Sequence, residues 1–302
     1  MLTSPTGRLR PIWSFVLAVG FSFAAFVACS FIAAAFTGDH ILRFEAIFRP
    51  LLIVVLFGVY FWLLTTADHV EDNRAAALGF PLTPGWGRQL GAGCLLGTIL
   101  TSLAVLPVAI WGDLGLSVHL NSRTLLRAAT VLTVLVCGAL GEEMMFRGYP
   151  FQRLEEAIGP VGAIGVFSVL FGIVHLTNPG ASAWGLLNTV LIGIVLAIAY
   201  LRTRALWLPW GLHLGWNTTL GLVYGLPVSG LRLFNVVVCT SAKGPRWLSG
   251  GSYGIEASAP GALAVVLGLI VVCRWPVTRL GQPLTFPRQE PEHLDSSSGI
   301  QS

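Results

Sequence analysis

The sequence predicts an all-α fold: a polytopic bundle of about eight transmembrane helices that forms a single integral-membrane domain over residues 1–302. Hydrophobic residues make up 54% of the chain and charged residues only 11%, whereas an average soluble domain has about 25% charged residues. The mean hydropathy is +0.76. Several apolar runs approach the roughly twenty residues that a helix needs to cross a bilayer. Together these observations exclude an ordinary soluble protein.

The apolar runs are bounded by charged residues, Gly, Pro or Trp, and each is expected to form a helix. The first run, at about 12–36, follows Arg8 and Arg10, as the apolar part of a signal peptide would. It is longer than the roughly 7–15 apolar residues of a signal peptide, so we predict a transmembrane helix instead. The other seven runs lie at about 48–66, 89–111, 124–141, 160–176, 184–201, 205–226 and 259–275.

Two segments are polar. Residues 227–258 are rich in Gly, Ser and Pro and are predicted to form a flexible loop. This loop contains a GxSxG match at residues 250–254, but a nucleophile elbow needs a strand-to-helix turn that a helical pattern does not supply. The tail, residues 276–302, is polar and Ser-rich and is predicted to be disordered.

The charges indicate membrane topology and not a nucleic-acid partner. Of the 18 basic residues, 17 are arginines, and they are scattered between the apolar runs instead of clustered. With a cytoplasmic N-terminus, eleven basic residues fall on the inner side and seven on the outer side, which predicts that both termini are cytoplasmic. The Arg-rich, Lys-poor usage favours a GC-rich bacterial genome, hence the bacterial inner membrane, with membrane lipids as partners. The five cysteines are far apart, which predicts neither a disulfide framework nor a CxxC metal site.

Two adjacent glutamates directly follow an apolar run. An ionisable residue beside or inside a span costs free energy unless it is paired or hydrated, so each is a candidate functional residue. If residues 138–156 are helical, Glu143 lies one turn before Arg147, which predicts a charge pair that makes burial tolerable. Glu142 is then free to face a cavity and act as a base. In the alternative, both glutamates lie at the interface and are solvated by head-group water.

Two histidines, His175 and His213, are embedded in apolar sequence. His213 and Asn217 are four residues apart, so on a helix their side chains point the same way. Asn188, in the preceding span, is expected to serve as interhelical hydrogen-bond glue. A carboxylate, two histidines and an amide on three separate spans can assemble hydrolytic chemistry at membrane depth.

That chemistry can run with or without a metal. In the metal version, His175, His213 and a carboxylate supply the His₂Glu set of many zinc peptidases, with an open position for water. In the metal-free version, Glu142 deprotonates a water with help from His175, while His213 and Asn217 donate hydrogen bonds to the oxyanion. The spacing leaves both versions open. The HExxH motif of zincins is absent from the sequence.

Three motifs in this order resemble those of the CAAX-protease and bacteriocin-processing family of intramembrane proteases, also called Abi or CPBP, which includes the type II CAAX endopeptidases. The motifs are EExxxR, FxxxH and HxxxN, at residues 142–147, 171–175 and 213–217. The family-like catalytic core covers residues 138–230, under a third of the chain. Each motif alone is weak, whereas the three in order on apolar spans are fairly specific.

The resemblance implies an all-helical membrane endopeptidase of roughly eight spans whose site opens within the bilayer. It implies that Glu142 is the water-activating base and His175 its partner. His213 and Asn217 are implied to be the oxyanion donors. The implied substrate is a membrane-associated peptide or protein, lipidated and CAAX-like or bacteriocin-like, although bacteria generally lack prenylated CAAX proteins.

The resemblance further implies that Glu143, Arg147 and Phe171 are supporting residues. The family is named as metalloproteases, but its mechanism is also described as glutamate-dependent without a catalytic metal. Whether zinc is a cofactor therefore stays open, and its ligands would be Glu142, His175 and His213. Two other functions remain as alternatives: a non-catalytic membrane immunity or scaffold protein that retains the motifs, and a proton- or ion-coupled transporter, in which buried Glu and His serve as proton relays.

Overall fold

The computed structural model describes residues 9–35, 41–67 and 74–276; all but the first residue of the predicted disordered tail lies outside them. The described chain is mostly helical, which confirms the predicted fold class. In chain order the elements are α1 (Pro11–Ala35), α2 (Ile41–Ala67), α3 (Arg74–Ala77), α4 (Trp86–Trp111), β1 (Asp113–Val118), α5 (Ser122–Phe146), α6 (Tyr149–Val174), α7 (Ala183–Thr203), α8 (Trp207–Thr218), the π-helix η1 (Thr219–Val223), β2 (Val238–Lys243), α9 (Arg246–Ser249), the 3₁₀-helix η2 (Ile255–Ala257) and α10 (Ala259–Arg274).

Each of the eight predicted apolar runs coincides with a long helix or, for the seventh, with α8 and η1 together. Four segments of the described residues are long and apolar enough to cross a membrane: Pro11–Cys29, Trp86–Trp111, Ser122–Val174 and Ala183–Thr203. The third of these contains both α5 and α6. Two further apolar helices, Leu52–Thr66 and Ala259–Arg274, are shorter. The helical bundle is therefore confirmed, while the count of eight spans is not.

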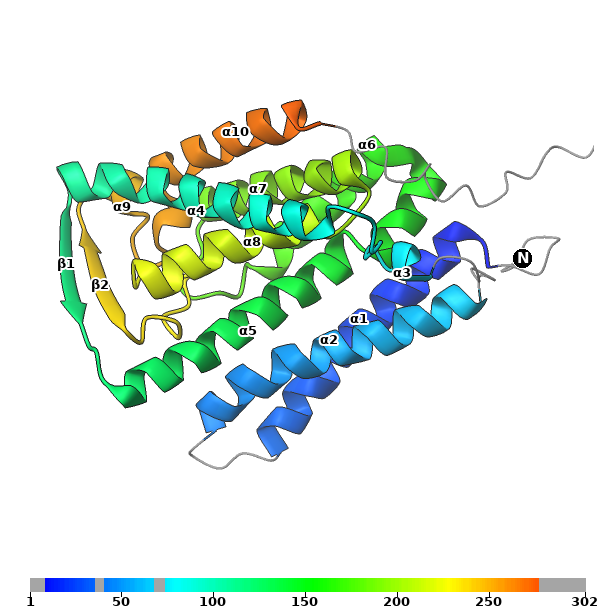
Figure 1. The fold of residues 1–302 in the computed structure, drawn as a ribbon, viewed down its shortest axis with the longest axis horizontal. Coiled ribbons are helices and arrows are strands. Elements are labelled where there is room, and N and C mark those ends of the chain that lie inside the picture. The colour runs from blue at the N-terminus through cyan, green and yellow to red at the C-terminus, as the bar shows by residue number, and fades with distance from the viewer. Residues whose placement is uncertain (1–8, 36–40, 68–73, 277–302) are drawn as a thin grey trace, which may run out of the picture.

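The long helices lie side by side along the long axis of the molecule, and β1, β2 and α9 gather at one end (Figure 1). One apolar core forms among α4, α5, α7, α8 and α10. A second forms among α1, α2, α5, α6 and α7. Because α5 and α7 contribute to both, the two cores meet along these helices, and the candidate site lies at that junction.

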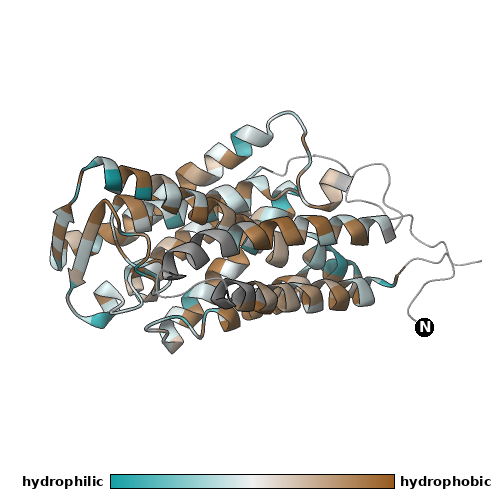
Figure 2. Cartoon of the chain, turned by 90° about the horizontal axis from the view of Figure 1, so that it is seen from below, coloured by the Kyte–Doolittle hydropathy of each residue, from teal (hydrophilic) through white to brown (hydrophobic). Residues whose placement is uncertain are grey.

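Large apolar side chains cover the outer faces of the bundle, and the brown colour along the long helices makes this visible in Figure 2. Leu95 of α4 is 62% exposed and Val161 of α6 is 81% exposed. An extended apolar surface of this kind would promote association in water. In a membrane, lipid tails cover such a surface, so the exposed apolar side chains agree with a membrane-spanning bundle.

Glycines bring α4 and α8 into backbone contact. A Cβ on Gly93 would lie 2.4 Å from the carbonyl oxygen of Leu208, and one on Gly215 would lie 2.2 Å from that of Cys94. Gly97 and Gly211 show the same close approach. Small residues let membrane helices pack this tightly, so these four glycines fix the position of α8, the helix that carries His213.

The segment at 227–258 was predicted to be a flexible loop, and this is wrong. It contains β2, which pairs antiparallel with β1 in the register Asp113↔Lys243 to Val118↔Val238, followed by α9 and η2. Tyr253 is 1% exposed and Ile255 is 0% exposed, so the segment packs into the bundle. The pairing joins residues more than 100 positions apart, which a local composition rich in Gly and Ser does not indicate.

Candidate active site

The two adjacent glutamates lie on the last turn of α5. The supposition that residues 138–156 are helical holds only in part, because α5 ends at Phe146 and α6 begins at Tyr149. At the break, a Cβ on Gly148 would lie 2.4 Å from a backbone oxygen of the preceding turn. Pro150 follows in the first turn of α6, where a proline is tolerated although it could not continue the helix before it.

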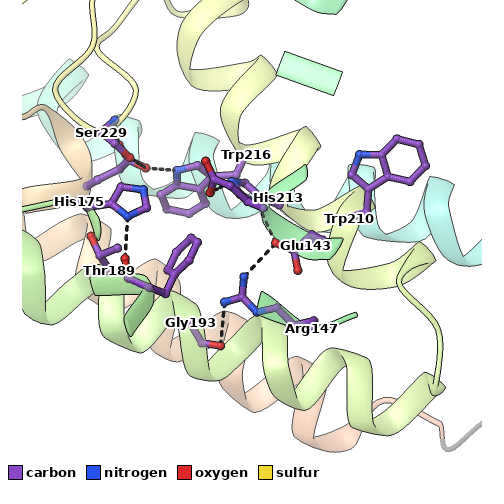
Figure 3. Close-up of polar contacts among 12 residues, drawn as sticks. Glu143, Arg147, His175, Thr189, Gly193, Trp210, His213, Trp216 and Ser229 are labelled. Carbon is purple, nitrogen blue, oxygen red and sulfur yellow. Dashed lines mark hydrogen bonds and ion pairs between the residues drawn. The ribbon is translucent and has the colours of Figure 1, made fainter. Parts of the chain in front are cut away.

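Glu143, Arg147 and His213 form a buried chain of polar contacts (Figure 3). Arg147 Nη1 donates to Glu143 Oε1 at 3.1 Å, and its Nη2 donates to the carbonyl of Gly193 at 3.2 Å. The predicted i, i+4 charge pair is therefore confirmed. On the other side, His213 Nδ1 lies 2.8 Å from the same Glu143 oxygen. The Phe171 ring lies 4.5 Å from the guanidinium carbon, a cation–π contact.

Glu142 differs from its neighbour in exposure. Its side chain is 40% exposed, whereas that of Glu143 is 0% exposed. Oε2 of Glu142 lies 3.8 Å from Nε2 of His213 and forms no hydrogen bond among the described residues. His213 therefore has a carboxylate oxygen beside each ring nitrogen. This environment favours a ring that donates from both nitrogens, because a carboxylate only accepts.

His175 lies at the C-terminal end of α6, where it caps the helix. Its Nδ1 is 2.7 Å from the carbonyl oxygen of Phe171, one turn earlier. A carbonyl can only accept, so Nδ1 carries the proton and Nε2 of the neutral ring is the acceptor. Phe171 thus contributes twice to the site: its carbonyl orients His175, and its ring lies against Arg147.

A cavity of about 40 Å³ opens beside these residues. His175, His213 and Asn217 line it, and the predicted shared face of His213 and Asn217 on α8 is confirmed. Glu142 and Glu143 are not among its lining residues. A volume of this size holds a few water molecules but not a peptide segment.

Three further polar residues line the cavity that the sequence analysis did not assign to the site: Thr189, Ser229 and Glu256. Glu256, on η2, is 5% exposed. A signal for it was present, since it is the only acidic residue between 227 and 258 and lies directly before an apolar run. The same criterion had singled out Glu142.

Asn188 forms a structural link, although not between two transmembrane helices as predicted. Its Nδ2 donates to the carbonyl oxygen of Glu256 at 2.8 Å and to that of Ser258 at 3.2 Å. It therefore ties α7 to the turn before α10. Burial raises the pKa of the Glu256 carboxyl above its ordinary value, although a hydrogen bond from the Ser229 backbone opposes this. Burial, followed by the charge of Glu256, raises the pKa of Tyr253 to about 12.

The candidate zinc ligands, Glu142, His175 and His213, do not come together as a metal site. Among the residues that the structure describes, no group of three or more His, Cys, Asp or Glu side chains is placed to hold a metal ion. Both nitrogens of His213 face carboxylates of α5, while His175 is held by a backbone carbonyl on α6. The donor set as arranged does not fit a zinc ion.

Comparison with known proteins gives one match. A family model described as type II CAAX prenyl endopeptidase Rce1-like matches residues 124–219, about a third of the chain. No curated protein and no solved structure matches. The matched segment runs from α5 to η1 and contains all three motifs, so it confirms the resemblance that the motifs indicated. The family implies a protease and, with the apolar helices, an integral membrane protein. Residues 124–219 are therefore similar to the type II CAAX prenyl endopeptidases.

Proposed function

We propose that this protein is an intramembrane endopeptidase that hydrolyses peptide bonds of membrane-associated substrates with a water activated by glutamate and histidine. One observation carries the proposal. The three family motifs lie on α5, α6 and α8: polar side chains of the second and third line one small cavity, and Glu143 of the first contacts His213 of the third in the buried interior. Burying polar and ionisable groups in an apolar bundle costs free energy, so a cluster of them indicates a functional site.

In the proposed reaction, Glu142 accepts a proton from a water while the water oxygen attacks the peptide carbonyl carbon. His175 Nε2 orients that water by accepting a hydrogen bond from its other O–H, which stays intact. The oxyanion then accepts hydrogen bonds from His213 Nε2–H and Asn217 Nδ2–H. When the carbon–nitrogen bond breaks, Glu142 returns its proton to the leaving amine. The unpaired Oε2 of Glu142 and its position beside His213 support this role.

The supporting residues act through His213. Glu143 accepts a hydrogen bond from Nδ1, which fixes the ring orientation and stabilises a positive charge on the ring. The positive charge of Arg147 compensates the negative charge of the buried Glu143 carboxylate. Nε2 is thereby kept as a donor for the oxyanion. An amide on the same helical face, Asn217, supplies a second donor without any change of protonation.

The substrate class follows from the family and from the size of the cavity. A cavity for a few waters cannot accept an extended peptide, so helices must part before cleavage, as gating motions do in other enzymes. We propose substrates at the membrane surface, either lipidated and CAAX-like or bacteriocin-like, with the enzyme in a bacterial inner membrane and both termini cytoplasmic. The excess of arginine on the predicted inner side supports this orientation.

The test compares membranes that contain the wild type, Glu142→Gln or Glu155→Gln at matched expression. Glu155 is a suitable control because it is also a partly buried carboxylate, paired with Arg204 at 2.7 Å and absent from the cavity lining. New peptide termini, identified by mass spectrometry, are expected with the wild type and Glu155→Gln but not with Glu142→Gln. Equal termini in all three, with each protein folded and inserted, would contradict the proposal and favour a scaffold or immunity role.

A further inference from the structure

Glu256 lies outside all three motifs and outside the segment that matches the family model, yet its side chain lines the same cavity as His175, His213 and Asn217. It comes from η2, on the chain that returns to the bundle after β2 and α9. The family resemblance assigns no role to this position. Its contacts, taken in turn, show what the carboxylate holds in place.

The carboxylate of Glu256 joins α8 to the turn that contains Ser229, which also lines the cavity. Oε1 accepts a hydrogen bond from Trp216 Nε1 at 3.1 Å, and Trp216 directly precedes Asn217 on α8. Oε2 accepts a hydrogen bond from the backbone N–H of Ser229, and the Ser229 hydroxyl lies 3.4 Å from Oε1. One carboxylate therefore spans the distance between the helix of the predicted oxyanion donors and residue 229.

The turn at residues 228–231 needs such a contact, because its backbone is strained. Ser229 has φ of 47°, and it is one of two non-glycine residues with positive φ in the described chain. A left-handed conformation of this kind costs free energy and persists only where the surroundings hold it. Glu256 holds the Ser229 N–H, and the Tyr253 carbonyl holds the N–H of Gly230 at 2.9 Å.

The same turn also reaches His175. Asn178, three residues after His175, donates from Nδ2 to the Ser229 carbonyl at 3.0 Å. The Ser229 carbonyl thus accepts a hydrogen bond from Asn178, and the Ser229 N–H donates one to Glu256. Glu256 is itself fixed, since Asn188 donates to its carbonyl oxygen. His175 and Asn217 are therefore connected through the hydrogen bonds of Asn178, Ser229 and Glu256 to Trp216, together with the short stretches of chain that join Asn178 to His175 and Trp216 to Asn217.

The charge of Glu256 is satisfied by neutral donors. No ion pair joins it to a basic side chain of the described residues; the ionisable groups that face it are His175, at the end of α6, and Tyr253, in its own segment. A buried carboxylate held only by N–H and O–H groups acts through geometry, because each of its oxygens requires a donor in a particular direction.

We propose that Glu256 is a positioning residue of the peptidase site: it holds the strained Ser229 turn against α8 and so sets the distance between His175 and Asn217 across the cavity. The proposal rests on the peptidase function proposed above. Gln at this position keeps one acceptor oxygen but places a donor amide against either Ser229 N–H or Trp216 Nε1–H. One of the two connections is then lost, and the turn relaxes away from α8.

The kinetic test uses the full chain in proteoliposomes with a quenched-fluorescence peptide that carries a farnesylated cysteine three residues before its C-terminus. Glu256→Gln is expected to lower kcat by about tenfold to a hundredfold, the effect of a small misplacement of catalytic groups, with little change in KM. The double variant Ser229→Gly/Glu256→Gln is expected to recover part of kcat, because glycine adopts positive φ without strain. Glu155→Gln is the control. Unchanged kcat in Glu256→Gln, an equal loss in the control, or no recovery in the double variant would each overturn the proposal.

A second readout does not depend on cleavage. Amide hydrogen exchange over residues 228–231 is expected to rise by at least about threefold in Glu256→Gln, since the Ser229 amide loses its acceptor. It should stay unchanged in Glu155→Gln. If the wild type shows no Glu142-dependent cleavage of the probe, the CAAX-like substrate class fails, and if membranes also show no Glu142-dependent peptide termini, the proposed function fails; exchange at the turn still decides the positioning link in either case. Unchanged exchange would overturn that link even in an active enzyme.

Discussion

Two buried glutamates, Glu143 and Glu256, both contact α8, and they are stabilised in opposite ways. Glu143 lies between Arg147 at 3.1 Å and His213 at 2.8 Å. Glu256 contacts only neutral donors, from Trp216 and Ser229. The first carboxylate is neutralised by positive charge, whereas the second is solvated by hydrogen bonds from uncharged groups.

The difference separates two tasks in one site. A carboxylate between two basic groups fixes charge, so Glu143 is suited to keep His213 protonated and oriented. A carboxylate held by directional neutral donors fixes geometry, so Glu256 is suited to hold backbone segments in place. Removing the partner of each should therefore have different consequences. Loss of a charged partner leaves a buried charge exposed to an apolar medium, whereas loss of a neutral donor mainly releases a segment.

The largest effect is expected from Arg147→Met. This change keeps an unbranched apolar stem but leaves the fully buried Glu143 carboxylate without its guanidinium. Breaking a buried pair on one side costs about 3–5 kcal/mol, which should appear as a lower free energy of unfolding in mixed micelles. Arg153→Met, which removes a pairing with a partly exposed glutamate on the same face of α6, is the control. Equal losses in the two variants would show that charge compensation does not distinguish Glu143.

A slightly smaller effect, on catalysis instead of stability, is expected from Asn217→Ala. Loss of one oxyanion donor costs about 2.7–4 kcal/mol of transition-state stabilisation, so kcat should fall by about 10²–10³-fold while KM changes little. Steady-state kinetics with the farnesylated probe measures both. A rise in KM at constant kcat would mean that Asn217 binds substrate and does not stabilise the oxyanion.

Gly215→Ala is expected to disturb both glutamates at once. The added Cβ would lie 2.2 Å from the Cys94 carbonyl oxygen and push α8 away from α4, together with the His213 and Trp216 contacts. Overpacking of this kind costs about 1–3 kcal/mol, measured as a lower Tm together with lower kcat. Gly165→Ala on α6, where a Cβ would meet nothing within 4 Å, should leave both unchanged. A silent Gly215→Ala would show that α8 is positioned by other contacts.

The smallest expected effect is a dependence of stability on pH, which tests whether Glu256 lacks a compensating positive charge. Burial raises the pKa of this carboxyl in the folded state above its unfolded value. The folded protein therefore holds the proton more tightly, and the stabilisation is complete below the unfolded pKa and lost as pH rises through the raised one. The Tm of the wild type relative to Glu256→Gln should fall between acidic and neutral pH. A constant difference across this range would mean that Glu256 has the same pKa in the folded and the unfolded protein.

Much of the candidate site could be predicted from local sequence. Glu143 and Arg147 are four residues apart, and so are His213 and Asn217, so helical geometry alone predicted which side chains share a face. The histidine beside Glu142 is His213, at 3.8 Å, whereas the implied roles made His175 its partner. The roles of the four catalytic residues stay predictions. The two separate apolar runs predicted two helices, but the supposed helix over 138–156 did not allow for the break between α5 and α6, which Gly148 and Pro150 mark.

The contacts of Glu256 could not be predicted in the same way. The hydrogen bond between His213 and Glu143 joins residues 70 positions apart, and Glu256 reaches Trp216 across 40. The β1–β2 pairing, which returns the chain to the bundle before η2, joins Gly115 with Ser241. No periodicity or spacing carries such pairings, because they depend on how separately formed helices and loops pack.

The sequence by itself determined the helical membrane bundle, the order of its apolar segments and the three motifs. Hydropathy and i, i+4 spacing are local properties, since they follow from the rise and turn of one helix and from the solvent around it. Only the tertiary structure decided that His213 lies between two carboxylates, that His175 is oriented by a backbone carbonyl, and that Glu256 lines the cavity. Those arrangements depend on the close packing of α4 and α8 and on a strained turn held by Asn178 on one side and by Tyr253 and Glu256 on the other. Such long-range contacts exist only once the whole bundle has formed.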